Sequence, residues 1–208
     1  PLLEALDSTS DAVRLWAATA LGHSREPAAL NATAALLNDP ESQVRVQAVR
    51  SIAQQAQPQA LPALAAAVSD PDGGVRLAAV AGIRDTLAQR GSWRAEALPT
   101  DFDLLAALAE SQRALLQAIR DSAPEVRAPA AAGLGSFDSL AAASAIADLA
   151  LQDEQAAVRE AATEALACCP FPHKQRLLAA GTEDPLPARR ARAIAVLAGI
   201  AAVDSAGQ

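Results

Sequence analysis

A Val-Arg pair recurs along the chain at a nearly constant spacing, and this repeat constrains the fold more than any other feature. Measured from Arg to Arg, the steps are 31, 31, 51, 32 and 31 residues, so four steps agree to within one residue. The pairs are Val13-Arg14, Val44-Arg45, Val75-Arg76, Val126-Arg127 and Val158-Arg159, and a sixth copy, Arg189-Arg190, keeps only the Arg. Self-similarity at such a period is typical of a solenoid built from stacked repeats.

The residues that follow each pair predict an amphipathic helix. If the Val is position 0, Ala stands at position +4 in every copy and Leu or Ile at position +8. At about 100° per residue, these three positions fall within about 80° of one another and form one buried stripe. Position +7 is small in all copies except the last, which has Val196. Small residues there indicate helices that approach one another closely.

A polar turn containing Asp precedes each of these helices, and a second apolar-periodic segment precedes the turn. We expect the Asp to accept hydrogen bonds from the free N–H groups at the helix start. One such helix pair cannot bury its own apolar face, so neighbouring pairs must stack. The sequence therefore predicts an all-α, right-handed α-α superhelix of about six helix pairs in a single domain, 1–208. The predicted repeats are 1–25, 26–56, 57–90, 102–137, 138–169 and 170–203, with an insert at 85–103 after the third.

The segment from Asp39 to Gln54, DPESQVRVQAVRSIAQ, resembles the short bacterial HEAT repeat of the phycobilisome-lyase type. The resemblance covers nearly the whole chain, except roughly 90–101. It implies a HEAT-like solenoid in which the second helix of each pair, the B helix, lines a concave surface that holds a partner. It also raises an alternative function, that of a bilin lyase subunit or chaperone that delivers an open-chain tetrapyrrole to a phycobiliprotein.

Positions +3, +6 and +10 lie opposite the buried stripe, and we call the surface that they form the B-helix face. It begins with polar and aromatic residues and continues into an Ala-lined centre, which would admit a helix or an extended peptide closely. An exposed Trp is a common anchor in protein interfaces. The predicted partner-binding residues are Trp16, His23, Gln47, Arg50, Gln54, Asp85, Glu164 and Arg192.

The alternative is that Ala is simply abundant and that a preceding repeat covers Trp16. The chain contains no Met and starts at Pro1, so we expect further residues before it and a place in a larger protein or complex.

The helical periodicity fails from Asp85 to Asp103, a segment that contains Gly91, Trp93 and Pro99. Irregular segments of this length in a compact repeat are usually functional or disordered. One hypothesis is that Trp93 packs the insert onto the solenoid and gives a partner a distinct edge. The other is a longer B helix that ends near Arg90, followed by a solvated connection.

Candidates for chemistry are few, and the sequence predicts a binding protein rather than an enzyme. Cys168, Cys169 and His173 form a C-C-x-x-x-H string, but zinc sites usually draw four ligands, with Cys pairs separated by two to four residues. We therefore expect neither a metal nor a cofactor. No Ser/His/Asp set, Gly-rich phosphate loop or paired-carboxylate site stands out.

The recurring Arg residues are open to two interpretations. They suit an anion or nucleic-acid site, or an Arg–Asp ladder that joins successive turns, and their spacing of one per repeat beside an Asp turn favours the ladder.

The net charge of −7, from 17 basic and 24 acidic residues, argues against nucleic acid as the partner and hence against a HEAT-like alkylpurine DNA glycosylase. No apolar run approaches the ~20 residues of a membrane span, so no membrane partner is expected and the predicted location is cytoplasmic. With no Tyr and two His, the chain has few residues suited to a bilin. The favoured function is a protein-binding module or scaffold.

Overall fold

The computed structural model describes residues 2–24, 27–93, 98, 102–169, 180–183 and 187–206. These residues form helices, turns and connections, and no strand occurs among them, so the all-α prediction is confirmed. The chain divides into two compact units, Pro1–Ala114 and Leu115–Gln208, with the boundary inside α6 (Leu104–Ala118). A single continuous solenoid over 1–208 stays a prediction.

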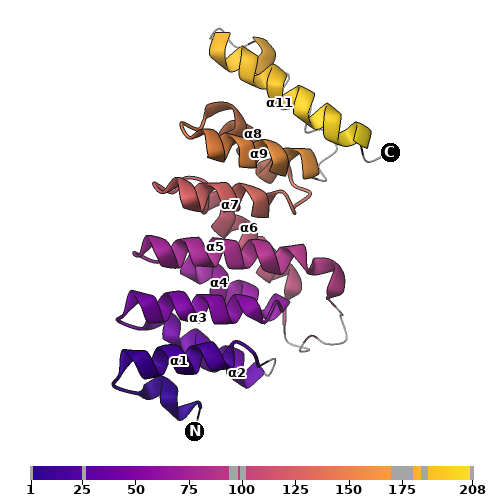
Figure 1. Ribbon diagram of the computed structural model, residues 1–208. Coiled ribbons are helices and arrows are strands. Elements are labelled where there is room, and N and C mark those ends of the chain that lie inside the picture. The colour runs from indigo at the N-terminus through magenta and orange to yellow at the C-terminus, as the bar shows by residue number, and fades with distance from the viewer. Residues whose placement is uncertain are drawn as a thin grey trace. The chain divides into compact units, whose positions relative to one another are not determined.

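Unit 1 contains successive helix pairs in which each B helix packs on the next. Figure 1 shows α1, α3 and α5 side by side in one layer, with α2 and α4 behind them. The B helices are α1 (Asp11–Leu21), α3 (Ser42–Gln54) and α5 (Gly73–Ala88). Their partners are the 3-10 helix η1 (Glu4–Asp7), α2 (Pro27–Ala35) with η2 (Leu36–Asn38), and η3 (Pro58–Ala60) with α4 (Leu61–Ala67).

Unit 2 repeats the same arrangement. Here α9 packs on α7 and on α8, and α11 packs on α9 (Figure 1). The bounds are α7 (Pro124–Leu134), α8 (Leu140–Gln152), α9 (Ala156–Cys168), η6 (Ala180–Glu183) and α11 (Pro187–Ala206). Most of the first helix predicted for the sixth pair lies outside the described residues.

The predicted buried stripe is confirmed in both units. Position +4 is buried in every B helix, and position +8 is buried in all but the last, where Leu197 is partly buried. Position 0 is buried at Val44, Val75, Val126 and Val158. In the first repeat, by contrast, Val13 is exposed. The stripe therefore forms the contact between successive repeats, and Val13 lies where no described residue covers it.

The predicted Arg–Asp ladder is also confirmed within each unit. We call each of its Arg–Asp ion pairs a rung. Each rung is bidentate: Arg14 Nε and Nη2 donate to the Asp39 carboxylate at 2.6 and 2.9 Å. The same geometry joins Arg45 to Asp70 and Arg127 to Asp153. In each rung the Arg belongs to one repeat and the Asp to the turn of the next, so the rungs tie neighbouring repeats together.

Asp39, Asp121 and Asp153 do not cap the helices that follow them as the sequence analysis expected. Asp39 Oδ1 accepts a hydrogen bond from the N–H of Glu41, two residues ahead, and Glu41 is itself the N-cap residue of α3. Asp153 makes the same bond with Gln155 N–H at 2.9 Å. The carboxylate of Asp39 thus lies two residues before the N-cap, where it accepts from the backbone of the turn and also from the Arg of the preceding repeat. A true side-chain cap occurs at Asp72, which accepts from the N–H groups of Gly74 and Val75.

The rungs shift the pKa values of their carboxyl groups. Hydrogen bonds from Arg14 and Arg127 hold the pKa values of Asp39 and Asp153 below the ordinary value of 3.8. Burial acts to raise the pKa of Asp70, but the hydrogen bonds from Arg45 and from a backbone N–H outweigh it, so this pKa is lowered too. All three carboxyl groups therefore favour the ionised form in the folded chain.

The predicted start of the insert at Asp85 is wrong, because α5 continues to Ala88. Thr86 and Leu87 are buried and extend the apolar stripe by one turn, whereas Asp85 lies on the exposed side and made the pattern look broken. This part of the alternative hypothesis, a longer B helix, is confirmed. A short 3-10 helix, Arg90–Ser92, follows, and Trp93 is half-buried. Most of the remaining insert, 94–97 and 99–101, lies outside the described residues.

Candidate functional site

A groove runs between α3 and α5 on the B-helix face of unit 1, with a volume of about 510 Å³. Arg50 and Gln54 reach it from α3, and Asp85 reaches it from α5. These three side chains are exposed. Small side chains line it between them, namely Ala53, Ala78 and Ala81 with Gly82. The structure thus places three of the predicted partner-binding residues around one groove, with the Ala-rich surface that the sequence predicted.

The remaining predicted residues of unit 1 are not among the residues that line this groove. His23, in the turn after α1, has its Nδ1 3.4 Å from Gln54 Nε2, so it adjoins the α3 wall of the groove. Gln47 is partly buried and its Nε2 donates to Ser51 Oγ at 3.3 Å, which holds it along α3. Trp16 on α1 is 70% exposed.

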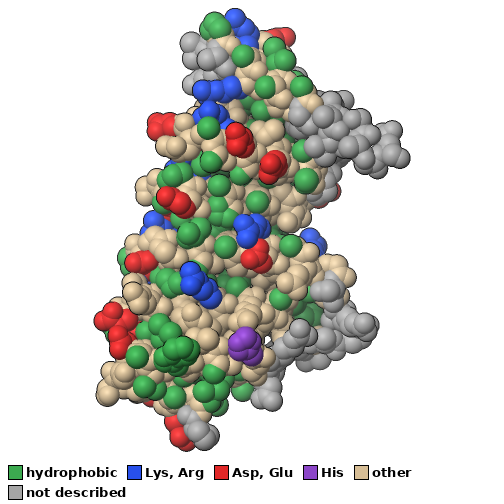
Figure 2. All heavy atoms as spheres, in the orientation of Figure 1, with side chains coloured by type: hydrophobic (Ala, Val, Ile, Leu, Met, Phe, Trp, Pro, Cys, Tyr) green, Lys and Arg blue, Asp and Glu red, His purple; other side chains and the backbone are tan. Residues whose placement is uncertain are grey.

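The charges on this surface are mixed. Figure 2 shows acidic and basic side chains scattered among apolar ones over α1, α3 and α5, rather than a patch of one sign. Asp85 forms an exposed ion pair with Arg84 at 2.8 Å, so its carboxylate is partly neutralised. Exposed pairs of this kind contribute little to stability, and a partner can displace them at low cost.

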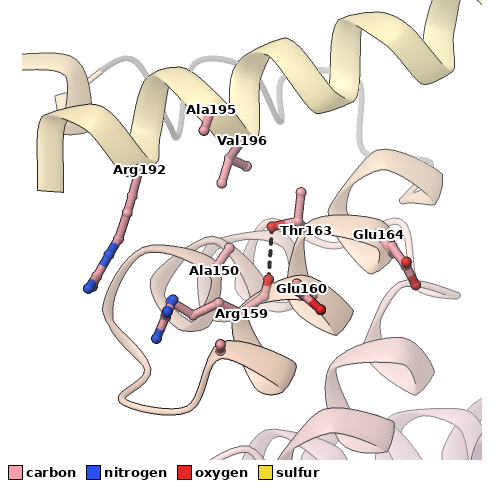
Figure 3. A pocket seen from close by; sticks show the side chains of 9 residues that line it. Ala150, Arg159, Glu160, Thr163, Glu164, Arg192, Ala195 and Val196 are labelled. Carbon is pink, nitrogen blue, oxygen red and sulfur yellow. Dashed lines mark hydrogen bonds between the residues drawn. The ribbon is translucent and has the colours of Figure 1, made fainter. Parts of the chain in front are cut away.

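Glu164 and Arg192 lie in unit 2 and line a different pocket, between α9 and α11, with a volume of about 340 Å³. In Figure 3 the Arg159 and Arg192 side chains extend toward the same side of this pocket, and Glu160 and Glu164 project from α9. Arg192 Nη1 donates to the carbonyl oxygen of Leu151 at 3.2 Å. Six of the eight predicted residues therefore belong to unit 1, and Glu164 and Arg192 belong to unit 2.

The sequence analysis missed some residues at both surfaces. Gln89 closes the groove of unit 1, and Arg159 and Glu160 line the pocket of unit 2. Arg159 was assigned only to the ladder, and its Nη1 does donate to the carbonyl oxygens of Asp153 and Glu154 as in the other repeats. Arg159 is at position +1 of α9, and it lines the same pocket as Arg192 and Ala195, at positions +3 and +6 of α11. Its position at the start of α9 was the signal that could have indicated a role at this pocket as well as in the ladder.

Of the three candidate metal ligands, the structure describes Cys168 and Cys169. Cys168 is exposed and Cys169 is buried, with its Sγ 3.7 Å from the Phe137 carbonyl oxygen, and His173 lies outside the described residues. In the part of the chain that the structure describes, no three His, Cys, Asp or Glu side chains cluster as metal ligands would. The helices described there also include none long and apolar enough to cross a membrane.

Comparison with known proteins gives the family. A family model described as HEAT repeats matches residues 1–84, 33–115, 95–167 and 112–198, which together span nearly the whole chain. The chain belongs to the HEAT-repeat family. This confirms the class that the segment from Asp39 to Gln54 resembles. No curated protein matches this HEAT-repeat chain significantly.

Solved structures share the fold of this HEAT-repeat chain at low sequence identity. The complex of CpcE and CpcF of phycocyanin lyase from Nostoc sp. PCC7120 is 22% identical, with a TM-score of 0.60, over 79% of this chain and 95% of that one. A designed armadillo repeat protein is 18% identical, with a TM-score of 0.59, over 96% of this chain and 98% of that one. Another designed armadillo repeat protein, in complex with the peptide (KR)4, is 17% identical, with a TM-score of 0.60, over 96% and 98%. Identities this low show a common fold and do not assign a function.

Proposed function

We propose that this HEAT-repeat chain is a protein-binding module or scaffold, and that its main contact with a partner is the B-helix face of unit 1. The observation that carries the proposal is the exposed Trp16 on the same layer of helices as a groove lined by Arg50, Gln54 and Asp85. Repeat folds of the HEAT and armadillo type commonly serve as protein-binding scaffolds, and one related structure holds a peptide.

Trp16 supplies the apolar part of the proposed contact. A Trp side chain that is 70% exposed leaves a large apolar area in water, and burying it against a partner contributes about 25 cal/mol per Å². Trp is enriched among the few residues that carry most of the binding energy of an interface. We therefore expect this side chain to be the strongest single contributor.

The groove supplies the polar part. Its Ala-lined surface lets a partner's main chain come close, while the exposed Arg50 offers a forked donor to a carboxylate and Gln54 pairs with a peptide amide. Asp85 exchanges its exposed pair with Arg84 for a basic residue of the partner. The partner that fits is a polypeptide segment with both an acidic and a basic residue.

Glu164 and Arg192, at the pocket of unit 2, are proposed as a second contact region for the same partner. Their exposed and partly buried side chains again offer one acid and one base. Changes at these residues are expected to weaken binding less than changes at Trp16, because the described residues that line that pocket include no large apolar side chain.

The alternative function is that of a bilin lyase subunit. It is favoured by the fold shared with the CpcE–CpcF complex of phycocyanin lyase, at 22% identity. Against it stand the absence of Tyr and the aromatic content of 2%, since a tetrapyrrole needs aromatic walls and hydrogen-bonding side chains. A shift in the absorbance spectrum of an added bilin, saturating at one equivalent of the chain, would favour the lyase function.

Affinity capture from native extract with matched variants tests the proposal. The variants are Trp16→Ala, and Gln47→Ala, Arg50→Ala and Gln54→Ala combined. The control is Glu110→Ala with Arg113→Ala, two exposed residues on α6, which is the first helix of its pair. We expect a protein retained by the wild type and by the control, and lost with Trp16→Ala while the melting temperature is unchanged. Equal retention by all variants, or loss with the control alone, would contradict the proposed surface.

A further inference from the structure

The groove between α3 and α5 contains a guanidinium group that no carboxylate of the described chain neutralises. Arg14 and Arg45 each bind a carboxylate in a rung, and Arg84 pairs with Asp85. Arg50 is exposed in the α3 wall of the groove, and among the described residues it has no such ion pair. Its charge is therefore available to a molecule that occupies the groove.

The opposite wall offers the opposite charge. Asp85 reaches the groove from α5, and its ion pair with Arg84 leaves 59% of the Asp85 side chain and 41% of the Arg84 side chain exposed. A pair this exposed costs little to exchange for another. Because one wall carries a cation and the other an anion, the complementary occupant carries one acidic and one basic residue.

Two close contacts fix the register of α3 against α5, which lie side by side in Figure 1. A Cβ added to Gly74 would lie 3.8 Å from a methyl carbon of Val46, and one added to Gly82 would lie 2.8 Å from the Cβ of Ala53. The second contact is seven residues further along α3 and eight residues further along α5 than the first. The two helices therefore run in the same direction.

This register gives the distance between the two charged residues along the groove. Arg50 stands three residues before Ala53, and Asp85 stands three residues after Gly82. Since Ala53 and Gly82 lie at the same level, Arg50 and Asp85 are six residue steps apart along the helix axes. At the helical rise of about 1.5 Å per residue, the separation is about 9 Å.

The groove is too narrow for a helix to enter it. On α5 its lining residues extend from Gly74 to Gln89, which is about 22 Å of helix. A volume of about 510 Å³ over this length gives a mean cross-section of about 23 Å². A helix about 10 Å across has a cross-section of about 80 Å². An extended chain is thinner, and the Ala-lined surface lets its main chain come close.

We propose that the groove binds an extended segment of the partner in which two residues separate an acidic residue, placed at Arg50, from a basic residue, placed at Asp85. An extended chain advances about 3.3 Å per residue, so a separation of three positions covers about 10 Å and matches the spacing of the two charges. Side chains of an extended chain alternate between two sides. A separation of three positions thus directs the two charges to opposite walls, whereas two or four positions direct both to one wall. The inference rests on the proposed partner-binding function and adds the conformation and charge spacing of the bound segment.

NMR titration with synthetic peptides at low ionic strength tests the charge spacing. The probes are capped Ser-rich peptides that contain either Glu-Ser-Ser-Arg or Arg-Ser-Ser-Glu, and the controls have the same composition with a single Ser between the two charged residues. We expect one of the two orders to bind about fivefold tighter than the other order and than both controls, because both of its charge pairs form together. Equal affinity for all four peptides, or no detectable binding, would overturn the proposal.

Exchanging the charges of the two walls tests which residues they come from. In the variant with Arg50→Asp and Asp85→Arg, the preferred peptide order should be the reverse of the wild-type order. Both residues are exposed, so the melting temperature should not change. The control, with Glu110→Gln and Arg113→Gln on α6, should keep the wild-type preference. A wild-type preference that survives the charge exchange would overturn the assignment.

Partner capture with Trp16→Ala reads out the proposed function separately. If capture depends on Trp16 and the peptides show no order preference, the binding function stands and the extended occupant of the groove does not. If the peptides show the expected preference and capture does not depend on Trp16, the occupant of the groove stands and Trp16 is not its anchor.

Discussion

In the ladder, one carboxylate accepts hydrogen bonds both from the preceding repeat and from its own turn. Asp153 accepts from Arg127 Nε at 2.8 Å and Nη2 at 2.9 Å, and from the N–H of Gln155 at 2.9 Å. Its side chain is 5% exposed, so these bonds are shielded from water. The rung therefore holds α7 against the turn that precedes α9, and its loss is expected to weaken the contact between the two repeats.

Replacing Asp153 with Asn removes the charge and one acceptor while keeping the shape of the turn. We expect the free energy of unfolding to fall by about 2 kcal/mol, the size typical of hydrogen bonds to charged groups, because the Arg127 donors lose a partner in a mostly buried place. Urea unfolding at pH 7 measures the change. Asp138→Asn, at an exposed site, is the matched control and should change stability by less than about 0.5 kcal/mol. Equal effects of the two substitutions would contradict the role assigned to the rung.

The lowered pKa values predict the direction of the pH dependence. A carboxyl group whose pKa is lower in the folded state stabilises the fold fully above its unfolded value, and loses this contribution as the pH falls through its folded value. Asp39, Asp70 and Asp153 all have pKa values below 3.8, so stability should decline as the pH drops below about 4. Thermal melts at pH 7 and pH 3 should show a smaller loss for Asp153→Asn than for the wild type. A loss of the same size in both would show that the rung is not its source.

The pairing of the ladder was predictable from the sequence, but its detailed geometry was not. One Arg and one Asp per repeat indicated ion pairs between turns, and the rung of Arg45 with Asp70 has that form. The bond of Asp39 to the N–H of Glu41 was not foreseen, because an Asp before a helix suits either a cap or a turn that precedes the cap. The choice depends on the position of the neighbouring repeat's Arg, which local sequence does not give.

At the scale of helices, the small residues at position +7 set how closely repeats approach. Gly82 on α5 faces α3 and α4, and an added Cβ would lie 2.8 Å from Ala53 Cβ and 3.1 Å from a Leu64 methyl carbon. Contacts this short force neighbouring atoms to move. The prediction that small side chains permit close packing is thereby confirmed between α3 and α5.

Gly82→Val is expected to destabilise the chain by about 2 kcal/mol, since overpacking a close helix contact costs 1–3 kcal/mol. Gly91→Val is the matched control, because a Cβ at Gly91 has no neighbour within 4 Å. Differential scanning calorimetry of the two variants measures the difference. If the Gly82→Val protein has the same melting temperature as the wild type, the helices are further apart than the structure shows.

The helices themselves were predicted well where the repeat is regular and less well where it stops. Positions 0, +4 and +8 of each repeat lie within the bounds of a B helix in the structure. The predicted insert, from 85, overlapped the predicted third repeat, which ended at 90, because Asp85 broke the pattern on the exposed side while Leu87 continued it on the buried side. Local periodicity does not reveal a helix end when the last turn carries both an exposed polar residue and buried residues.

At the scale of the whole molecule, the repeat identifies the family of the chain but not its binding partner. Matching of the HEAT-repeat model over nearly the whole chain agrees with a spacing visible in the sequence alone. The same periodicity assigned Arg50, Gln54 and Asp85 to one face, where they line a single groove. It could not show that Glu164 and Arg192 line a separate pocket in unit 2, since a repeat pattern gives each residue's face and not the depth of the surface between helices.

Photo-crosslinking from Trp16 is the most direct test of the proposed partner-binding face. A benzoylphenylalanine placed at position 16 reports which molecule lies against α1, and the same residue placed at Arg113 on α6 is the comparison. In native extract, the proposed function predicts a covalent adduct with one protein partner from position 16 and none from position 113. An adduct from position 113 alone, or from neither position, would contradict binding through the B-helix face.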